Sequence, residues 1–445
     1  MSHPSTQESE GSDTDSVEQH AGKDAGQSQQ ATEIQQNENR NLLALGAHYI
    51  LLRVAWVFKT ETVIMPVFLD TIAGAGWLRG CLPVLNRIGQ SIPPLFMANQ
   101  LRNAPLKKLP LRWMTLAMAV PFLFLSLVCF LTEDLRTSWM PPLFLACYTL
   151  FFAATGLGQL SFGTVQGKLI RANRRGRLMG IAGIVGSIVS ITGAWFLLQR
   201  WLDRPDGFTY IFAFTGIGFI VASLSTFFMH EPADDIEPLH QPALDHIRNA
   251  IEVVKTDANF RRAAAFGMCF STIILVFPHF QALGRQRLQL QTDGFSLMIW
   301  VITQNITVGI ASFFLGMLAD RKGNRLALRC QSFATALTPL LALFLASPLI
   351  EDGRRWYWLT FCLLGLTPVT MKTIVNYTLE LTEPVNHPCY VSTMSLCLAT
   401  PFLLSPLVGL LVDRLGFESV FITGSIVVAI SGVLTFRMSE PRDGI

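Results

Sequence analysis

Charged residues are scarce in this chain, and the motifs by which soluble enzymes hold phosphate or metal are missing from it. Charged side chains make up 15% of the 445 residues and hydrophobic ones 51%, with a mean hydropathy of +0.41. An ordinary soluble protein is less apolar, so we expect the chain to lie in a lipid bilayer. No phosphate-binding glycine loop and no Ser/His or His/Asp pair with catalytic spacing is present. We therefore predict that the protein is not an enzyme, takes no energy from ATP and needs no cofactor.

The eight cysteines exclude two common uses of this residue. None forms a Cys-x-x-Cys pair, and most lie inside apolar runs, as Cys129, Cys147, Cys269 and Cys362 do. This scatter argues against a zinc site or a disulfide framework and favours small core residues, so we predict no metal. A cleavable signal peptide is missing as well, because the N-terminus is polar and acidic. The first membrane helix must itself direct insertion.

Residues 1–40 differ from the rest of the chain. They hold eight acidic residues, with Lys23 and Arg40 as the basic ones, and almost no large apolar side chains. Such a segment cannot bury enough surface to offset the entropy cost of ordering. We predict a disordered acidic tail in the cytoplasm and a basic remainder whose loops face the cytoplasmic leaflet.

Twelve apolar stretches follow, each near the roughly 20 residues that a helix needs to cross a bilayer core. They are Leu43–Leu69, Trp77–Leu101, Leu111–Leu131, Met140–Leu169, Leu178–Trp201, Phe208–Met229, Ala263–Leu283, Phe295–Ala319, Leu326–Leu349, Trp356–Tyr377, Tyr390–Val412 and Val420–Arg437. We predict an all-α membrane protein. Basic residues gather in the loops 102–112, 168–177 and 321–329, which indicates one cytoplasmic side, and the even number of spans puts both termini there.

The longest connection between spans, 231–262, divides the chain into two halves. Its apolar residues recur at the spacing of an amphipathic surface helix. We predict six-helix bundles at 41–230 and 263–437, arranged as a parallel repeat, and a short cytoplasmic tail at 438–445.

One loop between two spans has a distinctive sequence. Residues 316–329 read GMLADRKGNRLALR, with Gly316, Asp320, Arg321, Gly323 and Arg325 at a fixed spacing. This spacing resembles the loop motif of the major facilitator superfamily of twelve-helix secondary transporters. The resemblance implies two pseudo-symmetric six-helix bundles, and it implies that these five residues latch one conformer of the transport cycle rather than bind substrate. The alternative is a plain basic turn on the cytoplasmic side.

The first half departs from this pattern. Asn99 and Gln100 stand where the corresponding motif would have Asp and Arg, so we expect the aspartate latch to be missing there. The fifth span has four glycines but no proline, which argues against the drug/proton antiporters of the superfamily. The resemblance identifies no subfamily.

Charged and amide side chains inside the spans are the candidates for a substrate site, because burying them in a bilayer is costly. The first span carries Arg53, Lys59 and Glu61. Lys59 and Glu61 point about 200° apart on an ideal helix, so we expect them to face different ways unless the helix is distorted. We predict that Glu61 pairs with Arg87 of the second span and that Lys59 or Arg53 faces a central cavity. The alternative is a shorter first span whose charges reach the membrane surface.

Further candidates lie in both halves. Asn86 and Gln90 flank Arg87, Gln304 and Asn305 lie at comparable depth in the eighth span, and Lys372 and Asn376 form a polar stripe on the tenth. Each amide alone more often bonds helix to helix. His279 is a candidate for proton coupling because its pKa can sit near the working pH. The alternative is a satisfied interface residue at the end of a helix.

These features together predict a secondary transporter that moves a small polar organic solute by alternating access. We expect an anionic or zwitterionic solute, a proton or another ion as the coupling partner, the lipid bilayer as environment and no nucleic acid. We expect a monomer in the inner membrane. The alternatives are a transporter-like sensor or assembly protein that binds without translocating, and a lipid-modifying enzyme, for which the chain lacks a catalytic pair.

Overall fold

The computed structural model describes residues 11–234, 243–290, 294–383 and 386–440. Within them the chain forms helices and connecting turns, without a strand. The first half contains α1 (Gly11–Val57), α2 (Ile64–Ile72), α3 (Gly76–Arg102), α4 (Lys108–Leu131), α5 (Met140–Leu169), α6 (Ala172–Gly193), η1 (Ala194–Leu198), α7 (Gln199–Leu202), α8 (Gly207–Leu224) and η2 (Ser225–Phe228). The second half contains α10 (Ala258–Ser271), α11 (Ile273–Arg287), α12 (Gly294–Lys322), α13 (Asn324–Leu345), α14 (Gly353–Trp356), α15 (Trp358–Leu364), α16 (Leu366–Glu380), α17 (His387–Ala399), η4 (Thr400–Leu404), α18 (Ser405–Leu434) and η5 (Thr435–Arg437).

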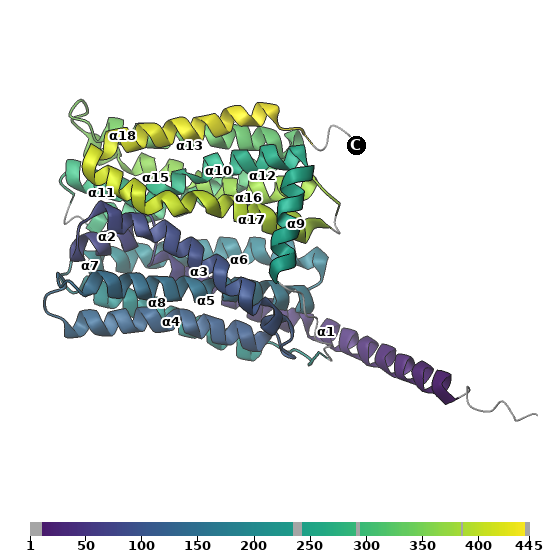
Figure 1. The fold of residues 1–445 in the computed structure, drawn as a ribbon. Helices are drawn as coiled ribbons and strands as arrows, with labels where there is room; N and C mark the ends of the chain where they lie inside the picture. Colours follow the sequence, from purple (N-terminus) through teal and green to yellow (C-terminus); the bar gives the residue numbers. More distant parts are fainter. Residues whose placement is uncertain (1–10, 235–242, 291–293, 384–385, 441–445) are drawn as a thin grey trace, which may run out of the picture.

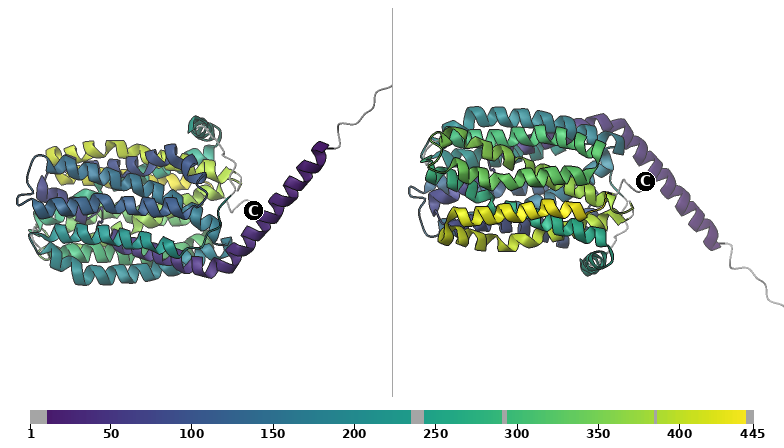
Figure 2. Two further views of the ribbon diagram at one scale, coloured as in Figure 1. Left: turned by 90° about the horizontal axis from the view of Figure 1, so that it is seen from below. Right: turned by 90° about the horizontal axis from the view of Figure 1, so that it is seen from above.

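The two halves lie against each other as two groups of roughly parallel rods (Figure 1). α3 packs against α18, and α12 packs against η1 and α7, so each half lends helices to the boundary. α1 and the last described residues emerge from the same end of the molecule (Figure 2). We call this the near end. The opposite end, with the connections 73–75, 203–206 and 288–290, is the far end.

Nine helical stretches in the described part of the chain are long and apolar enough to cross a membrane. The last of them, Cys389–Arg437, holds two of the predicted spans, because its backbone turns at Gly416 with φ +80° and ψ 174°. Only glycine adopts this φ readily. The first two predicted spans are not among the nine: the first is broken after Val57, and α3 carries polar residues and three prolines.

The structure describes the N-terminal segment from Gly11 onward as helix, and the disorder that composition predicts for residues 1–40 stays a prediction. α1 runs without interruption from Gly11 to Val57 and projects away from the bundle (Figure 1). Residues near its membrane end are held by the first half: Asn41 Nδ2 donates to His230 O at 2.8 Å, and Glu38 pairs with Arg171 at 2.6 Å. Composition alone could not indicate these contacts, because their partners lie more than 130 residues away in the chain.

The linker between the halves contains α9 (Ala243–Thr256), in the segment for which an amphipathic helix is predicted. α9 stands across the near end of the bundle and packs against α10 and α17 (Figure 1). The structure describes the predicted tail 438–445 only as far as Glu440, and its remaining residues lie outside the described part.

Glycine allows the closest helix packing in the first half, between α3 and α5. A Cβ added to Gly156 would lie 2.5 Å from Gln90 O, and one added to Gly89 would lie 2.6 Å from Phe152 Cβ. Real Cβ atoms do not approach so closely, so both positions require glycine. This packing brings the polar face of α3 against α5, where the candidate site lies.

Candidate functional site

The first span is broken at mid-length, and the break holds a charged pair. Between the end of α1 and the start of α2, Thr60 Oγ1 accepts a hydrogen bond from Ile64 N at 3.3 Å. Lys59 Nζ donates to Glu61 Oε1 at 3.0 Å. On an unbroken helix the two side chains would diverge by about 200°. The break is therefore what lets them meet.

The buried member of this pair is the lysine. Lys59 is 0% exposed, and its ammonium lies 3.3 Å from the centroid of the Trp56 ring and 4.4 Å from that of Phe152. Aromatic faces and a carboxylate together compensate a desolvated cation. Glu61 keeps 28% of its side chain exposed. Of the two residues predicted to face a cavity, Lys59 or Arg53, Lys59 is buried, and the carboxylate of Glu61 is the accessible group of the pair.

Amide side chains extend from Glu61 across α3 to α5. Asn86 Nδ2 donates to Glu61 Oε2, and Gln90 Nε2 donates to Asn86 Oδ1. Gln159 of α5, an exposed residue, donates to Gln90 Oε1 at 3.3 Å. The structure thus joins three sequence candidates with Gln159 in one polar cluster. We call Glu61, Asn86, Gln90 and Gln159 the carboxylate–amide cluster.

The two arginine candidates lie outside this cluster. The guanidinium of Arg87 is 4.8 Å from the centroid of the Phe402 ring in the second half. The sequence predicts that Arg87 pairs with Glu61, but the α3 residue that hydrogen-bonds to Glu61 is Asn86. Arg87, the next residue on the helix, points in a different direction. Arg53 packs against α6, where its Cδ lies 3.0 Å from the position of a Cβ on Gly186.

The candidates of the second half have three kinds of surroundings: one bonds across the boundary between the halves, one bonds within its own helix, and two are exposed. Gln304 Oε1 accepts a hydrogen bond from Thr62 Oγ1 at 2.6 Å, which joins the halves next to Glu61. Asn305 donates to a carbonyl of its own helix, Val301 O, at 2.8 Å. Lys372 and Asn376 are exposed, one helical turn apart on α16. Lys372 has no hydrogen bond or ion pair to any other residue that the structure describes.

Asp70, just past the predicted first span, is a functional candidate that the sequence prediction missed. It pairs with Arg79 of α3, Gln281 Nε2 of α11 donates to its Oδ2 at 2.9 Å, and Arg285 Nη1 lies 3.8 Å from that oxygen. Two of these three partners belong to the second half. The carboxylate therefore ties the halves together toward the far end.

His279, the predicted coupling residue, lies on α11 two residues before Gln281. It is fully buried, and its ring nitrogens have no hydrogen-bond partner among the described residues. Within the same part of the chain, no three His, Cys, Asp or Glu side chains come together as ligands for a metal ion.

Two aspartates close the far end by capping helices of the opposite half. Asp413 accepts hydrogen bonds from Gly76 N at 2.8 Å and Trp77 N at 3.1 Å, at the start of α3. Asp203 Oδ1 accepts one from Gly294 N at 3.0 Å, at the start of α12. A Cβ on either glycine would lie within 2.5 Å of the carboxylate. Anions are stabilised at helix N-termini, so both contacts favour closure of this end.

At the near end, part of the predicted latch contacts the end of its own half. Arg325 N donates to Glu440 Oε2 at 3.3 Å. Gly323 has φ +87°, and a Cβ there would lie 2.4 Å from Glu440 Cδ, so this turn requires glycine. Asp320 and Arg321 are exposed at the end of α12. Their role as a latch stays a prediction.

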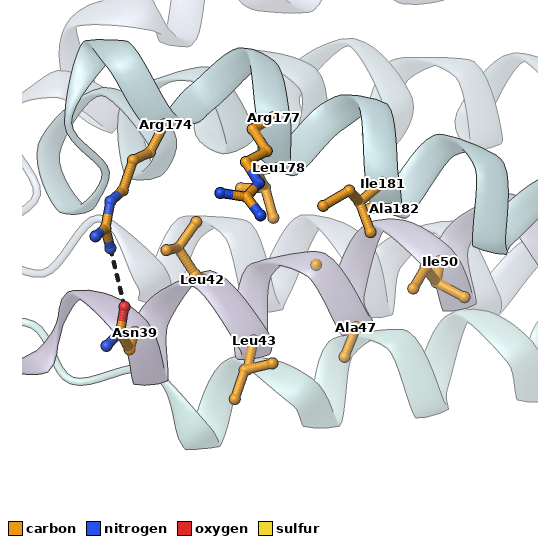
Figure 3. A pocket seen from close by; sticks show the side chains of 11 residues that line it. Asn39, Leu42, Leu43, Ala47, Ile50, Arg174, Arg177, Leu178, Ile181 and Ala182 are labelled. Atoms are coloured by element: carbon orange, nitrogen blue, oxygen red, sulfur yellow. Dashed lines mark hydrogen bonds between the residues drawn. The ribbon is translucent and has the colours of Figure 1, made fainter.

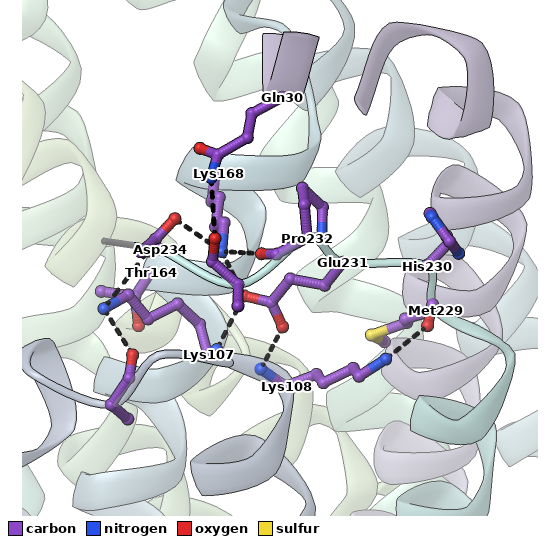
Figure 4. A network of polar contacts seen from close by, with 12 residues as sticks. Gln30, Lys107, Lys108, Thr164, Lys168, Met229, His230, Glu231, Pro232 and Asp234 are labelled. Atoms are coloured by element: carbon purple, nitrogen blue, oxygen red, sulfur yellow. Dashed lines mark hydrogen bonds and ion pairs between the residues drawn. The ribbon is translucent and has the colours of Figure 1, made fainter. Parts of the chain in front are cut away.

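The first half has an equivalent clasp, in which Glu231 takes the position that Glu440 has in the second half. Glu231 accepts hydrogen bonds from Lys107 N at 2.7 Å and Lys108 N at 2.8 Å, at the start of α4 (Figure 4). Lys168 Nζ lies 2.9 Å from Glu231 and 2.8 Å from Asp234. Glu231 and Glu440 each stand in a Met-x-Glu-Pro sequence after the last helix of their half. This repeat was present in the sequence and could have identified both glutamates.

Comparison with known proteins places this geometry in a family. The family model described as Major Facilitator Superfamily matches residues 103–383, more than half of the chain. No curated protein sequence matches the chain.

Solved transporter structures share the fold over nearly their full length. A mutant of the nucleoside transporter NupG is 12% identical with a TM-score of 0.69, covering 89% of this chain and 99% of that one. A D-xylose-proton symporter is 12% identical with a TM-score of 0.66, covering 91% and 98%. A POT family transporter in complex with 5-aminolevulinic acid is 13% identical with a TM-score of 0.65, covering 91% and 96%. At such identities the likeness shows the fold alone.

Proposed function

The chain belongs to the Major Facilitator Superfamily, and from this premise we propose that it carries a small polar organic solute across its membrane by alternating access. The family and its transporter neighbours identify a transporter rather than an enzyme. The observation that supports the proposal best is the accessible carboxylate of Glu61 at a break in a membrane helix. Broken helices at mid-membrane commonly form the substrate sites of secondary transporters.

The surroundings of Glu61 suit a binding group better than a structural one. Ionisable side chains at this depth mark substrate pathways by default, because leaving them uncompensated in a bilayer is costly. Lys59 and Asn86 hold the carboxylate in place. Its remaining exposed surface is free to accept a hydrogen bond or a cationic group of the solute.

The second half supplies a group of opposite sign. Lys372 and Asn376 are exposed in the middle of the chain's α16 and would offer an ammonium and an amide. A solute with a cationic and an anionic group, or with several hydroxyl and amide groups, would satisfy both halves. The solutes named for the structural neighbours, a nucleoside, D-xylose and 5-aminolevulinic acid, are small polar molecules that carry such groups.

We propose Asp70 as the residue that couples proton movement to the opening of the far end. Its negative charge holds Arg79 of the first half and lies within 3.8 Å of Arg285 of the second. Loss of that charge would weaken the contact between the halves, so that the far end could open. His279 on the same helix as Arg285 stays the second candidate for this role.

Uptake into liposomes tests both parts of the proposal. We expect the purified protein to accumulate one class from a panel of nucleosides, sugars, amino acids and organic anions when a proton gradient is imposed. Asp70→Asn should abolish accumulation but retain exchange at equal solute concentrations, because the carboxylate–amide cluster is untouched. Asp134→Asn, an exposed carboxylate at the far end, is the matched control and should accumulate normally.

Two results would contradict the proposal. Gradient-driven accumulation by Asp70→Asn at the wild-type level would remove Asp70 from coupling. A protein that binds one solute class but moves none of it would instead be a sensor.

A further inference from the structure

A groove of about 580 Å³ lies between α1 and α6 and is lined by residues that the transport proposal does not use. Its walls are apolar, with Leu43, Ala47 and Ile50 on α1 and Ile181 on α6. Arg174 and Arg177 stand at its end toward the near end of the molecule, and both side chains reach from α6 toward α1 (Figure 3). The groove therefore has an apolar body and a basic head.

The length of the groove matches one leaflet of a bilayer. Along α1 it extends from Asn39 to Ile50, which is about 16 Å at the helical rise of 1.5 Å per residue. Half of a hydrocarbon core of roughly 30 Å is about 15 Å. Leu43 is 77% exposed and Ile181 55% exposed, so both present apolar surface for an acyl chain to cover.

The two arginines differ in how far their charge is compensated. Arg174 donates to Asn39 Oδ1 at 2.9 Å and lies 3.2 Å from Glu38. Arg177 forms no hydrogen bond or ion pair with any other described residue. A guanidinium binds phosphate through two parallel hydrogen bonds and is suited to a headgroup at the membrane surface.

We propose that this groove binds an anionic glycerophospholipid from the leaflet at the near end. One acyl chain lies between α1 and α6, and the headgroup phosphate is bound by Arg177, with Arg174 beside it. The occupant has to combine a negative charge with a chain about as long as the groove. A zwitterionic lipid offers the chain without the net charge, and inorganic phosphate offers the charge without the chain.

Native mass spectrometry of the delipidated protein in detergent can measure this binding. The probes are dioleoyl phosphatidylglycerol and dioleoyl phosphatidylcholine, titrated separately. We expect the first phosphatidylglycerol to bind at least about fivefold more tightly, the effect of one basic residue near an anionic headgroup. Arg177→Gln should remove most of this preference. Ala47→Trp should weaken the binding of both lipids because the indole fills the groove.

Arg200→Gln is the matched control. Arg200 is an exposed arginine toward the far end of the predicted span Leu178–Trp201, which Arg177 directly precedes, and it has no ion-pair partner among the described residues. It should leave both affinities unchanged, and all variants should unfold at the wild-type temperature in the absence of lipid. An unchanged preference in Arg177→Gln, or an equal loss in Arg200→Gln, would overturn the proposal. Oleate and inorganic phosphate serve as competitors for the bound phosphatidylglycerol. If either displaced it as effectively as unbound phosphatidylglycerol does, the proposal would be overturned as well.

Discussion

At the scale of single residues, the contact between Lys59 and Glu61 depends on a distortion of the first span. On a regular helix their side chains would point about 200° apart. The helix is interrupted between Val57 and Ile64, and there the two side chains meet. The rings of Phe151 and Phe152, more than 90 residues away in the chain, face the ammonium and compensate part of its desolvation.

Removing the Lys59 ammonium should destabilise the protein. Lys59→Met leaves the partly exposed Glu61 carboxylate without its cation, and the loss of a hydrogen bond between charged groups costs about 1.5–3 kcal/mol. The double variant Lys59→Met/Glu61→Gln should recover most of this loss, because no uncompensated charge remains. Denaturant unfolding of the detergent-purified variants measures both values. A double variant no more stable than the single one would show that the pair does not act as a unit.

At the scale of elements, the boundary between the halves is made by helix ends. α3 and α12 each begin at a glycine whose N–H is capped by an aspartate of the other half. The two aspartates stand in similar local sequences, Leu-Asp-Arg at 202–204 and Val-Asp-Arg at 412–414. The sequence prediction located both turns at the ends of spans. It could not tell that their carboxylates reach across the boundary, because that depends on how the halves pack.

Loss of a cap should loosen the far end selectively. Asp413→Ala removes the acceptor for two backbone N–H groups of α3, and an N-cap substitution of this kind costs about 1 kcal/mol. We expect faster hydrogen exchange in the first turn of α3 and unchanged exchange in the first turn of α12. Asp203→Ala should give the reverse pattern. Equal exchange changes at both helices in either variant would argue that the caps do not act locally.

The segment of α1 near the membrane should dock in a pH-dependent way. Arg171, which hydrogen-bonds to the Glu38 carboxylate, lowers the pKa of Glu38 below its ordinary value. Because the docked pKa is the lower one, docking is fully favoured above the ordinary pKa of about 4.3 and is lost as the pH falls through the docked value.

This pH dependence can be read by electron paramagnetic resonance from a nitroxide amino acid at Gln36, an exposed position on α1. We expect the label to gain mobility only as the pH falls below about 4.3, the ordinary pKa of a glutamate. Glu38→Gln should already show the mobile state at pH 7. A label whose mobility is the same at pH 7 and pH 3 in the wild type would contradict the assignment.

At the scale of the whole molecule, the sequence predicted the all-helical membrane fold and the superfamily. Hydropathy and the loop at 316–329 were sufficient for this, because both are local features. The residues it missed are Asp70, Glu231 and Glu440. Each lies just outside a span, where a charge is unremarkable, and each gains its role from partners in distant helices.

Solute counterflow in liposomes tests the central claim most directly, because it requires a binding site and alternating access but no gradient. We expect wild-type protein to exchange its solute. Glu61→Gln and Lys372→Gln should each lower the exchange rate by about tenfold or more, the loss of a charged hydrogen bond. Thr149→Val, which removes only a hydroxyl bonded to its own helix, should exchange normally. Wild-type exchange by a correctly folded Glu61→Gln variant would show that the carboxylate–amide cluster is not the substrate site.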